Sequence, residues 1–388
     1  MRYKKILLGL LLVIAVGLVL FQRIGPRSID AGRNQVISPR EQPVSEDARR
    51  LHQDLIVVDL HADSLLWARD PAERHAWGHV DLPRLADGNV ALQGFTIVTK
   101  SPWGRNIQHN TDSTDSITAL SVLQAWPART WMSLTERALF QAQRLRALAK
   151  AAPDKLVLIR SRAELARYLE RREREPRLVA GFLGVEGAHA LDGSLANIDV
   201  LFDAGVRMMA PTHFFDNDLG GSAHGAKKGG LTEKGRAMLH KMEAKGMLVD
   251  LAHASARTIK DVLALATRPV VVSHTGVRGT CDNQRNLSDP QLRAIAKVGG
   301  VIGIGFWQTA VCGDSAAAIA RAIRHAVTVT SIDHVALGSD FDGSEPVPFD
   351  ASGLSQLTAA LLDEGFSAEE VRKIMGQNTL RLLAQVLP

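Results

Sequence analysis

Residues 56–63 read IVVDLHAD, a run of mostly branched apolar residues that ends in a histidine and an aspartate two positions apart. A run of this length and composition predicts a buried β-strand. Because side chains alternate across a strand, His61 and Asp63 would point to the same side. Two interpretations of the pair stay open at this point: the two side chains bind one metal ion, or they bond to each other.

Seven further runs of strand length follow along the chain, and most are separated by segments of helical periodicity. They cover residues 91–98, 178–185, 206–212, 247–253, 269–274, 300–306 and 334–340. Buried strands that alternate with helices predict a parallel α/β fold, and eight of them suit a closed (β/α)8 barrel of the TIM type. An open doubly wound sheet is the alternative, but no GxGxxG turn follows the first strand.

The N-terminus has the pattern of a membrane segment. Arg2, Lys4 and Lys5 precede an uncharged apolar run at residues 6–21. As a helix the run would span about 24 Å, slightly less than the ~30 Å hydrocarbon core of a bilayer. We therefore expect residues 1–27 to be an apolar helix that anchors the chain, with a cleaved signal peptide or a buried helix as alternatives. By the positive-inside rule, the expected location is the cell membrane, with one N-terminal span and an exported catalytic domain, or secretion after cleavage.

The composition changes after this segment. Residues 28–50 are rich in Pro, Arg, Ser and Gln and lack apolar periodicity, which predicts a linker before a catalytic domain at residues 51–388. The net charge is +5, but residues 1–50 hold nine Lys+Arg against four Asp+Glu, so the remaining chain is neutral. No basic face interleaved with aromatic residues is apparent, and this argues against nucleic-acid binding.

Ionisable side chains occur at the ends of most predicted strands. They are His61, Asp63, Glu186, His213, His253, His274 and Asp340. The carboxyl ends of barrel strands meet at one rim. A single histidine at a strand end is more often a satisfied core residue, but seven unpaired groups in one confined space would cost several kcal/mol. A metal centre removes that cost.

The ligand types narrow the choice of metal. Imidazole and carboxylate without thiolate suit zinc, with manganese, cobalt and iron as competitors. Three histidines and two carboxylates are too many for one catalytic zinc. They suit two zinc ions, about 3.5–4 Å apart, that share a bridging hydroxide able to attack a carbonyl.

Taken together, the motifs resemble the membrane dipeptidases, the renal dipeptidase family of the amidohydrolase superfamily. The resemblance runs in order, across nearly all of residues 55–388, through DLHADSLLW, GVEGAH, THFFDN, GLTEKGRAMLHKMEAKGMLVDLAHAS, VVSHTG, CDNQRNLSD and HVALGSDFDG. Many other amidohydrolases open with His-x-His and carry a carboxylated lysine on the fourth strand. This chain opens with His-x-Asp and has no lysine there, and Glu186 is available as the bridging ligand.

The resemblance implies a role for each residue of the motifs. It implies that one zinc is bound by His61, Asp63 and Glu186, and a second by Glu186, His253 and His274. It also implies that His213 polarises the scissile carbonyl and stabilises the oxyanion. Asp340 would carry the proton from the bridging water to the leaving amine, and Arg285 would bind the free carboxylate of a dipeptide. Neither His189 nor Asp342 is expected to bind metal; each is expected either to support a ligand or to be a satisfied residue at the rim.

Two cysteines and one long insertion remain to be placed. In an exported protein, Cys281 and Cys312 favour a disulfide over two reduced core thiols, and animal relatives carry a disulfide at the corresponding places. Those relatives also carry tyrosines after the seventh strand, where this chain reads FWQTAVC. Residues 99–133, after the second strand, form either a lid or substrate-binding loop or a surface insertion.

The sequence therefore predicts a zinc-dependent dipeptidase with two Zn²⁺ per chain, a dipeptide substrate, a membrane contact through its N-terminus and a possible homodimer. An amidohydrolase of another amide or ester, such as an N-acyl amino acid or a lactone, is the alternative among enzymes. A binding protein on an inactive barrel is the alternative outside them.

Overall fold

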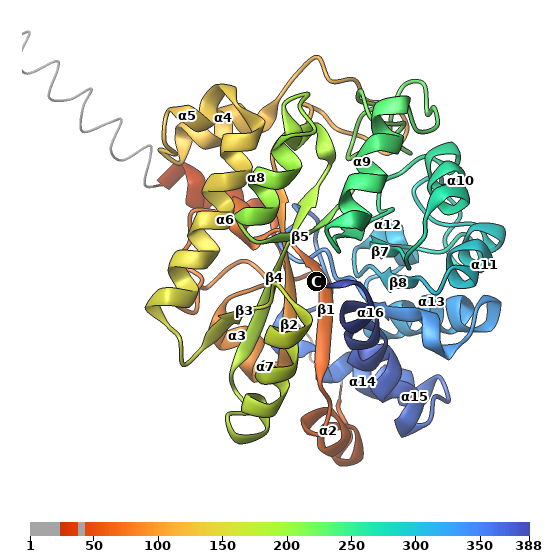
Figure 1. Cartoon of the computed structure of the whole chain (residues 1–388). Helices are drawn as coiled ribbons and strands as arrows, with labels where there is room; N and C mark the ends of the chain where they lie inside the picture. Colours follow the sequence, from red (N-terminus) through yellow and green to blue (C-terminus); the bar gives the residue numbers. More distant parts are fainter. Residues whose placement is uncertain (1–23, 38–42) are drawn as a thin grey trace, which may run out of the picture.

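A parallel sheet forms the centre of the fold (Figure 1). The computed structural model describes residues 24–37 and 43–388. Eight strands neighbour one another in the order β6-β5-β4-β2-β1-β9-β8-β7, and each pair is parallel. The strands are β1 (Val57–Ala62), β2 (Val90–Val98), β4 (Val179–Glu186), β5 (Val206–Met209), β6 (Leu248–Val249), β7 (Val271–Thr275), β8 (Val301–Ile304) and β9 (Val335–Leu337).

The two ends of this strand order are in contact. Asp250, which follows β6, forms a parallel bridge with Val271 of β7. The Leu251 amide donates a hydrogen bond of 2.8 Å to the Val271 carbonyl. Eight parallel strands whose end strands meet are consistent with a TIM-type barrel. The parallel α/β fold and its eight predicted strands are therefore confirmed.

One strand was not predicted. The strand β3 (Leu156–Leu158) pairs with the first half of β4, where Leu156 lies opposite Val179. From Leu183 onward, β4 pairs with β5 instead. A three-residue strand is too short to give a periodic signal in the sequence.

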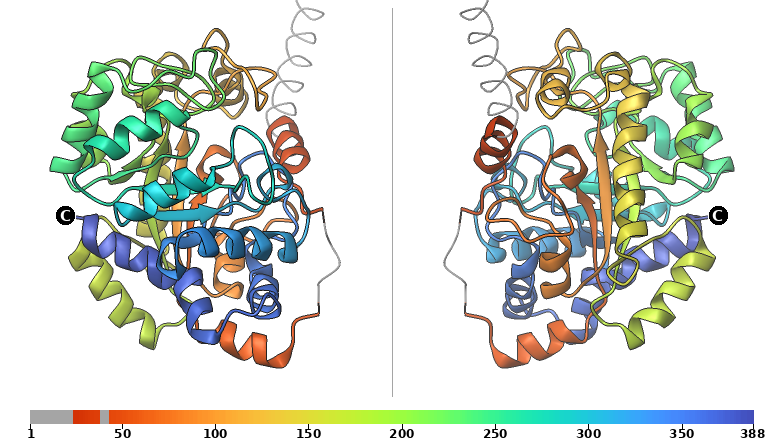
Figure 2. Two further views of the ribbon diagram at one scale, coloured as in Figure 1. Left: turned by 90° about the vertical axis from the view of Figure 1, so that its right-hand side faces the viewer. Right: turned by 90° about the vertical axis from the view of Figure 1, so that its left-hand side faces the viewer.

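Helices surround the sheet (Figure 2). They are α2 (Glu46–Gln53), α3 (Leu82–Asp87), α4 (Ser116–Leu123), α5 (Arg129–Met132), α6 (Leu134–Ala151), α7 (Arg162–Arg174), α8 (Asn197–Asp203), α9 (Glu233–Ala244), α10 (Ala256–Leu265), α11 (Asp289–Lys297), α12 (Gln308–Val311), α13 (Ala316–Val329), α14 (Ser355–Asp363), α15 (Ala368–Arg372) and α16 (Asn378–Val386). Several begin at a serine whose hydroxyl accepts a hydrogen bond from the first turn, as Ser133 does for α6 and Ser161 for α7. Every residue of β1, β2 and β4 is buried, as expected for parallel strands covered on both faces.

The location predicted from the N-terminus needs correction. Within residues 24–37 and 43–388, no helix is long and apolar enough to cross a membrane. The single N-terminal span is therefore not supported, and the apolar run at residues 6–21 lies outside the described residues. The division of the chain at residues 27 and 50, and the homodimer, stay predictions.

Part of the predicted linker is ordered against the barrel. Residues 24–33 are helical, and α2 begins at Glu46, before the expected domain boundary. The helical segment lies near the end of the sheet opposite α2 (Figure 2). Because α2 directly precedes β1, the helical segment lies beside the rim where the strands end.

Candidate metal centre and substrate cavity

The seven predicted strand-end residues meet in one buried cluster around Glu186, the last residue of β4. The Oε1 atom of Glu186 lies 2.9 Å from His253 Nε2, 3.2 Å from His274 Nε2 and 3.7 Å from His61 Nε2. Its other oxygen, Oε2, lies 3.2 Å from His213 Nε2. Four imidazoles on four different strands or the loops after them therefore converge on one carboxylate.

The remaining two carboxylates join the cluster through His61. Its Nε2 atom lies 3.4 Å from Asp63 Oδ1 and 3.8 Å from Asp340 Oδ1. Both His253 and Asp340 have a backbone φ of 60°, a left-handed conformation that costs a non-glycine residue about 1 kcal/mol or more. Strain of this kind persists where the surrounding structure holds a side chain in place.

Two hydroxyl groups orient the cluster. The Ser273 hydroxyl lies 3.0 Å from Nδ1 of His61 and 2.9 Å from Nδ1 of His274, which leaves both Nε2 atoms directed toward Glu186. The Thr96 hydroxyl donates a 2.6 Å hydrogen bond to Asp63. Partners of this kind fix the orientation of metal-binding side chains.

Sequence reasoning missed both hydroxyl groups. Ser273 directly precedes His274, so simple alternation would place it on the opposite face of β7. The pairing of β7 with β8 shifts register between Val272 and Thr275, and alternation along the sequence carries no sign of this shift.

The electrostatics of the cluster are those of a cation site. Burial raises the pKa of Glu186 well above its ordinary value, and the Asp63 carboxylate adds to the shift. Burial also raises the pKa of Asp340, to about 7. Burial lowers the pKa of His253 and His274, and the nearby Arg285 lowers both further. Crowded carboxylates with neutral imidazoles are stabilised when a cation enters.

The donor atoms fit metal ions. Although Glu186 Oε1 and His61 Nε2 are close to other polar atoms, both are buried without a partner in hydrogen-bond geometry. Ligand atoms lie within 4.8 Å of one another in three overlapping groups, which are His61–Glu186–His274, Glu186–His213–His253 and His61–Asp63–Asp340. These groups include His213 and Asp340, so the division of ligands between two ions stays a prediction.

Arg285 lies beside the cluster on the loop after β7. Its guanidinium donates to the His274 carbonyl at 2.7 Å and to the Thr275 hydroxyl at 3.2 Å. The side chain is buried, and in the described chain no carboxylate lies within ion-pair distance of it. The predicted disulfide between Cys281 and Cys312 is present and joins this loop to the end of α12.

One cavity of about 1020 Å³ is lined by Arg285 and by five residues of the cluster, which are Asp63, Glu186, His213, His253 and Asp340. Its wall includes Trp103, Ile107 and Leu120 from the insertion at residues 99–133. The insertion is thus part of the wall of the site, in agreement with its interpretation as a binding loop. Trp307, from the FWQTAVC segment, also lines the cavity.

Three more polar residues surround the site. Asp342 accepts hydrogen bonds from the Ser64 hydroxyl at 2.6 Å and the His79 amide at 2.7 Å, as a satisfied residue at the rim would. His189 is buried, and neither of its ring nitrogens has a hydrogen-bond partner among the described residues. His224 lines the cavity with its ring 5.1 Å from that of His253, and it was missed because it lies within a loop rather than at a strand end.

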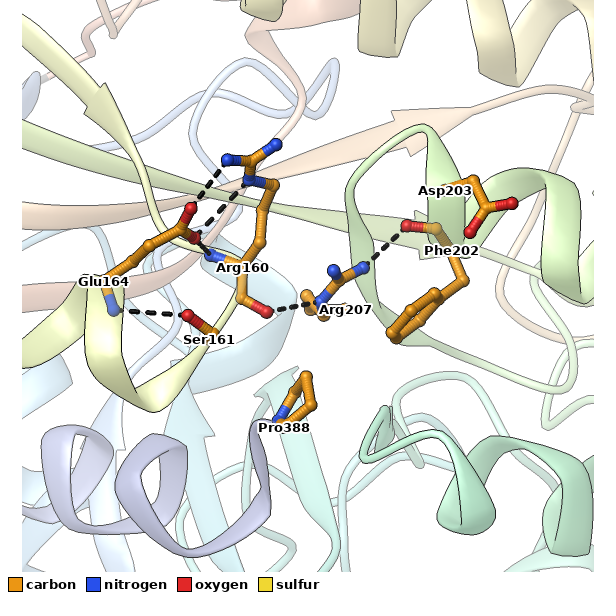
Figure 3. A pocket seen from close by; sticks show the side chains of 7 residues that line it. All are labelled: Arg160, Ser161, Glu164, Phe202, Asp203, Arg207 and Pro388. Atoms are coloured by element: carbon orange, nitrogen blue, oxygen red, sulfur yellow. Dashed lines mark hydrogen bonds and ion pairs between the residues drawn. The ribbon is translucent and has the colours of Figure 1, made fainter.

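A second cavity, of about 330 Å³, lies near the amino end of β5 (Figure 3). Three of its four charged side chains have partners in hydrogen bonds or ion pairs. Arg160 pairs with Glu164 at 2.6 Å, and Arg207 donates to the carbonyl groups of Arg160 and Phe202. The candidate metal-binding groups of the described residues all lie in the first cluster and none lines this second cavity.

The chain is similar to known proteins over most of its length. The family model of the membrane dipeptidases, peptidase family M19, matches residues 45–387. The dipeptidase aclJ of Aspergillus oryzae is 27% identical over 354 residues, which cover 85% of this chain and 78% of that protein.

Solved structures have the same fold. The probable dipeptidase PvdM of Pseudomonas aeruginosa is 20% identical, with a TM-score of 0.73 over 88% of this chain and 98% of that one. A metallopeptidase of Rhodobacter sphaeroides, solved with a phosphinate mimic of the dipeptide L-Ala-D-Ala, is 23% identical, with a TM-score of 0.67 over 86% of this chain and 99% of that one.

Proposed function

The chain belongs to the membrane dipeptidase family, peptidase family M19, and on this premise we propose that it is a zinc-dependent hydrolase that cleaves the peptide bond of dipeptides. The observation that carries the proposal is the position of Arg285. A buried guanidinium without a carboxylate partner in the described chain lies in the same cavity as a buried cluster of metal-ligand type. A dipeptide supplies a carboxylate for the first and a scissile carbonyl for the second.

The five predicted ligands would hold two zinc ions. They are His61, Asp63, Glu186, His253 and His274. When bound, the ions would activate water as a nucleophile and polarise the scissile carbonyl. The convergence of three Nε2 atoms on Glu186 Oε1 supports the shared, bridging position proposed for Glu186.

Two further residues act on the reacting groups. Asp340 accepts the proton of the attacking water and passes it to the leaving amine. Its carboxylate is buried in the cluster, 3.8 Å from His61 Nε2, where the attacking water would be held. Burial lowers the pKa of His213, so the ring is neutral and can donate one hydrogen bond to the oxyanion.

A panel of substrates tests the proposal. We expect release of two amino acids from dipeptides with a free C-terminus in the presence of zinc. An N-acyl amino acid offers Arg285 the same carboxylate, whereas a lactone offers none. Faster hydrolysis of N-acyl amino acids or lactones than of every dipeptide would favour the alternative amidohydrolase.

Arg285→Ala tests the contact that defines the substrate. The variant should lose about ten- to 150-fold in kcat/KM on a free-acid dipeptide, the worth of a charge-assisted hydrogen bond of about 1.5–3 kcal/mol. A C-terminally amidated dipeptide lacks the partner charge, so the same substitution should cost it little. Zinc content should not change.

Arg278→Ala is the matched control, because Arg278 is a half-exposed cation that donates to the Asn286 carbonyl in the same loop. Arg278→Ala should leave kcat/KM unchanged for both the free-acid and the amidated dipeptide. Equal losses on the free acid and the amide in Arg285→Ala would mean that Arg285 supports the loop rather than the substrate.

A further inference from the structure

The helical segment at residues 24–33 lies outside the part of the chain that the family model matches, residues 45–387. It is nevertheless fixed to the barrel by a buried carboxylate. Asp30 accepts hydrogen bonds from Arg69 at 2.9 and 3.0 Å, from Trp77 at 3.0 Å and from Asn34 at 2.7 Å. Arg69 also pairs with Asp342, two residues after Asp340. The segment is thus tied to the loop that carries a proposed proton-transfer residue.

Further contacts hold the segment at both ends. A Cβ atom at Gly25 would lie 3.3 Å from the side chain of Leu123 in α4, so the helical segment packs closely against the insertion. Beyond the helix, Val36 forms a parallel bridge with Val347, and the Asn34 side chain accepts a 3.0 Å hydrogen bond from the Ser344 amide. These contacts span the rim from α4 to the segment after β9.

In this position the segment lines the substrate cavity with Ser28, Ile29, Gly32 and Arg33. Ile29 belongs to a group of apolar lining residues that we call the apolar wall. The apolar wall consists of Ile29, Leu66, Trp67, Val98, Leu120 and Leu123. All of its members except Ile29 come from the loops after β1 and β2 or from the end of β2.

The apolar wall and Arg285 follow strands on opposite sides of the barrel. In the closed strand order, β2 and β7 have three strands between them on either side, so they lie on opposite sides of the rim. Arg285 follows β7, and most of the apolar wall follows β1 and β2. A dipeptide held by its carboxylate at Arg285, with its peptide bond at the cluster, would direct its amino-terminal residue toward the apolar wall.

From this arrangement we infer that the segment at residues 24–33 forms part of the substrate-binding wall and makes the enzyme select dipeptides with a large apolar amino-terminal residue. The inference rests on the proposed dipeptidase function and names the substrate class within it. A cavity of about 1020 Å³ leaves room for a large side chain, because small-molecule sites typically have volumes of ~300–1000 Å³.

A pair of isoleucines in the full-length chain provides the test. Ile29 is 39% exposed and lines the cavity, whereas Ile24, in the same helical segment, is 58% exposed and does not line it. Ile29→Ala should lower kcat/KM for Leu-Ala by about three- to tenfold and for Ala-Ala by less than about twofold. Ile24→Ala should leave the ratio of the two unchanged.

Gly32→Leu tests the same wall by adding volume. Gly32 lines the cavity, and a Cβ atom at this position meets nothing within 4 Å, so the backbone has room for a side chain here. This variant should lose more activity on Phe-Ala than on Ala-Ala. Thermal unfolding and zinc content should match the wild type, and Ile29→Val serves as the milder variant should Ile29→Ala fold poorly.

The outcomes separate the inference from the function on which it rests. Hydrolysis of dipeptides with the same Leu-Ala to Ala-Ala ratio in wild type, Ile29→Ala and Gly32→Leu would overturn the inference and leave the dipeptidase function intact. Failure of the zinc-loaded wild type to cleave any dipeptide would overturn both. A wild-type preference for Leu-Ala that Ile29→Ala reduces would support both.

Discussion

Glu186 is the residue on which the proposed chemistry depends most directly. Its carboxylate faces four imidazoles at 2.9–3.7 Å, and one of its oxygens is buried without a partner in hydrogen-bond geometry. Glu186→Gln removes the charge that two zinc ions would share. We expect bound zinc to fall below two per chain, and turnover to fall by several orders of magnitude.

Glu243→Gln is the matched control for this prediction. Glu243 is a buried glutamate that accepts hydrogen bonds from Thr267 and Arg268, away from the cluster. Metal analysis after gel filtration should find two zinc ions in this variant. Two zinc ions and a near-normal rate in Glu186→Gln would show that the carboxylate does not bridge.

His52 offers a test of stability that does not involve the metal. Its ring contacts the Thr358 hydroxyl at 2.8 Å and the Gly88 carbonyl at 3.0 Å, and burial lowers its pKa from 6.5. Below pH 6.5 the unfolded chain therefore binds a proton that the folded chain does not, and stability is lost as the pH falls. The free energy of unfolding should decrease by up to about 1.4 kcal/mol per pH unit from this residue.

Denaturant unfolding of wild type and His52→Gln between about pH 5 and about pH 7.5 measures this contribution. Glutamine can make both hydrogen bonds but does not titrate, so its curve should have a shallower pH dependence. Parallel curves for the two proteins would mean that His52 takes up its proton in the folded state as readily as in the unfolded one.

Individual site residues were predictable only where strand geometry constrained them. Parallel strands bring their carboxyl ends to one rim, so His61, Glu186 and His274 could be grouped from their positions at strand ends alone. Ser273 and His224 carry no such signal. The first owes its position to a register shift in β7, and the second belongs to a loop whose path depends on tertiary contacts.

At the level of elements, the disulfide between Cys281 and Cys312 holds the loop that carries Arg285. Replacing both cysteines with serine should lower the free energy of unfolding by about 2–4 kcal/mol, because the bond closes a loop with a sequence separation of 31. KM for a free-acid dipeptide should rise as Arg285 becomes less well positioned. Zinc content should stay the same, since the ligands lie on other segments.

Denaturant unfolding and steady-state kinetics of the double variant, compared with those of wild type without reductant, check this prediction. A loss of stability with an unchanged KM would separate the structural role of the bond from any role in substrate binding. The sites of the two cysteines were predictable from the motifs, whereas the geometry of the loop between them was not.

Other elements show why a local pattern is not enough. The polar composition of residues 28–50 predicts a linker, yet Asp30 is buried against Arg69, 39 positions away in the sequence. Only the tertiary structure brings Asp30, Arg69 and Asp342 into contact. The short strands β3 and β6 likewise owe their existence to pairing with neighbours.

For the molecule as a whole, the alternation of apolar runs and helical segments was sufficient to predict the parallel α/β architecture. Each run is long enough to be buried, and each crossover is long enough to return the chain to the same edge. The N-terminal apolar run also predicts a structure, a membrane span, but this location is not supported by the described residues. A single apolar run is a less specific signal for an anchor than eight repeated strand–helix units are for a fold.

The cluster also couples metal binding to the stability of the whole chain. In the zinc-free protein, burial and neighbouring carboxylates raise the pKa of Glu186, and burial raises that of Asp340 to about 7. Burial opposes protonation of His61, but the carboxylates of Glu186 and Asp63 raise its pKa to about 10. Above pH 6.5 the folded zinc-free chain therefore holds protons that the unfolded chain has released, and its stability falls as the pH rises.

Zinc reverses this dependence, because a cation stabilises the same carboxylates in their ionised form. We expect the difference in melting temperature between zinc-loaded and chelator-treated protein to be larger at about pH 8 than at about pH 6.5. Differential scanning calorimetry of both forms at each pH measures it. The Glu186→Gln variant, which has lost a shared ligand, should show a smaller difference at both values. If the difference in melting temperature did not depend on pH, zinc would displace no protons from the cluster. The carboxylates would then be ionised in the zinc-free protein and stabilised by other charged groups.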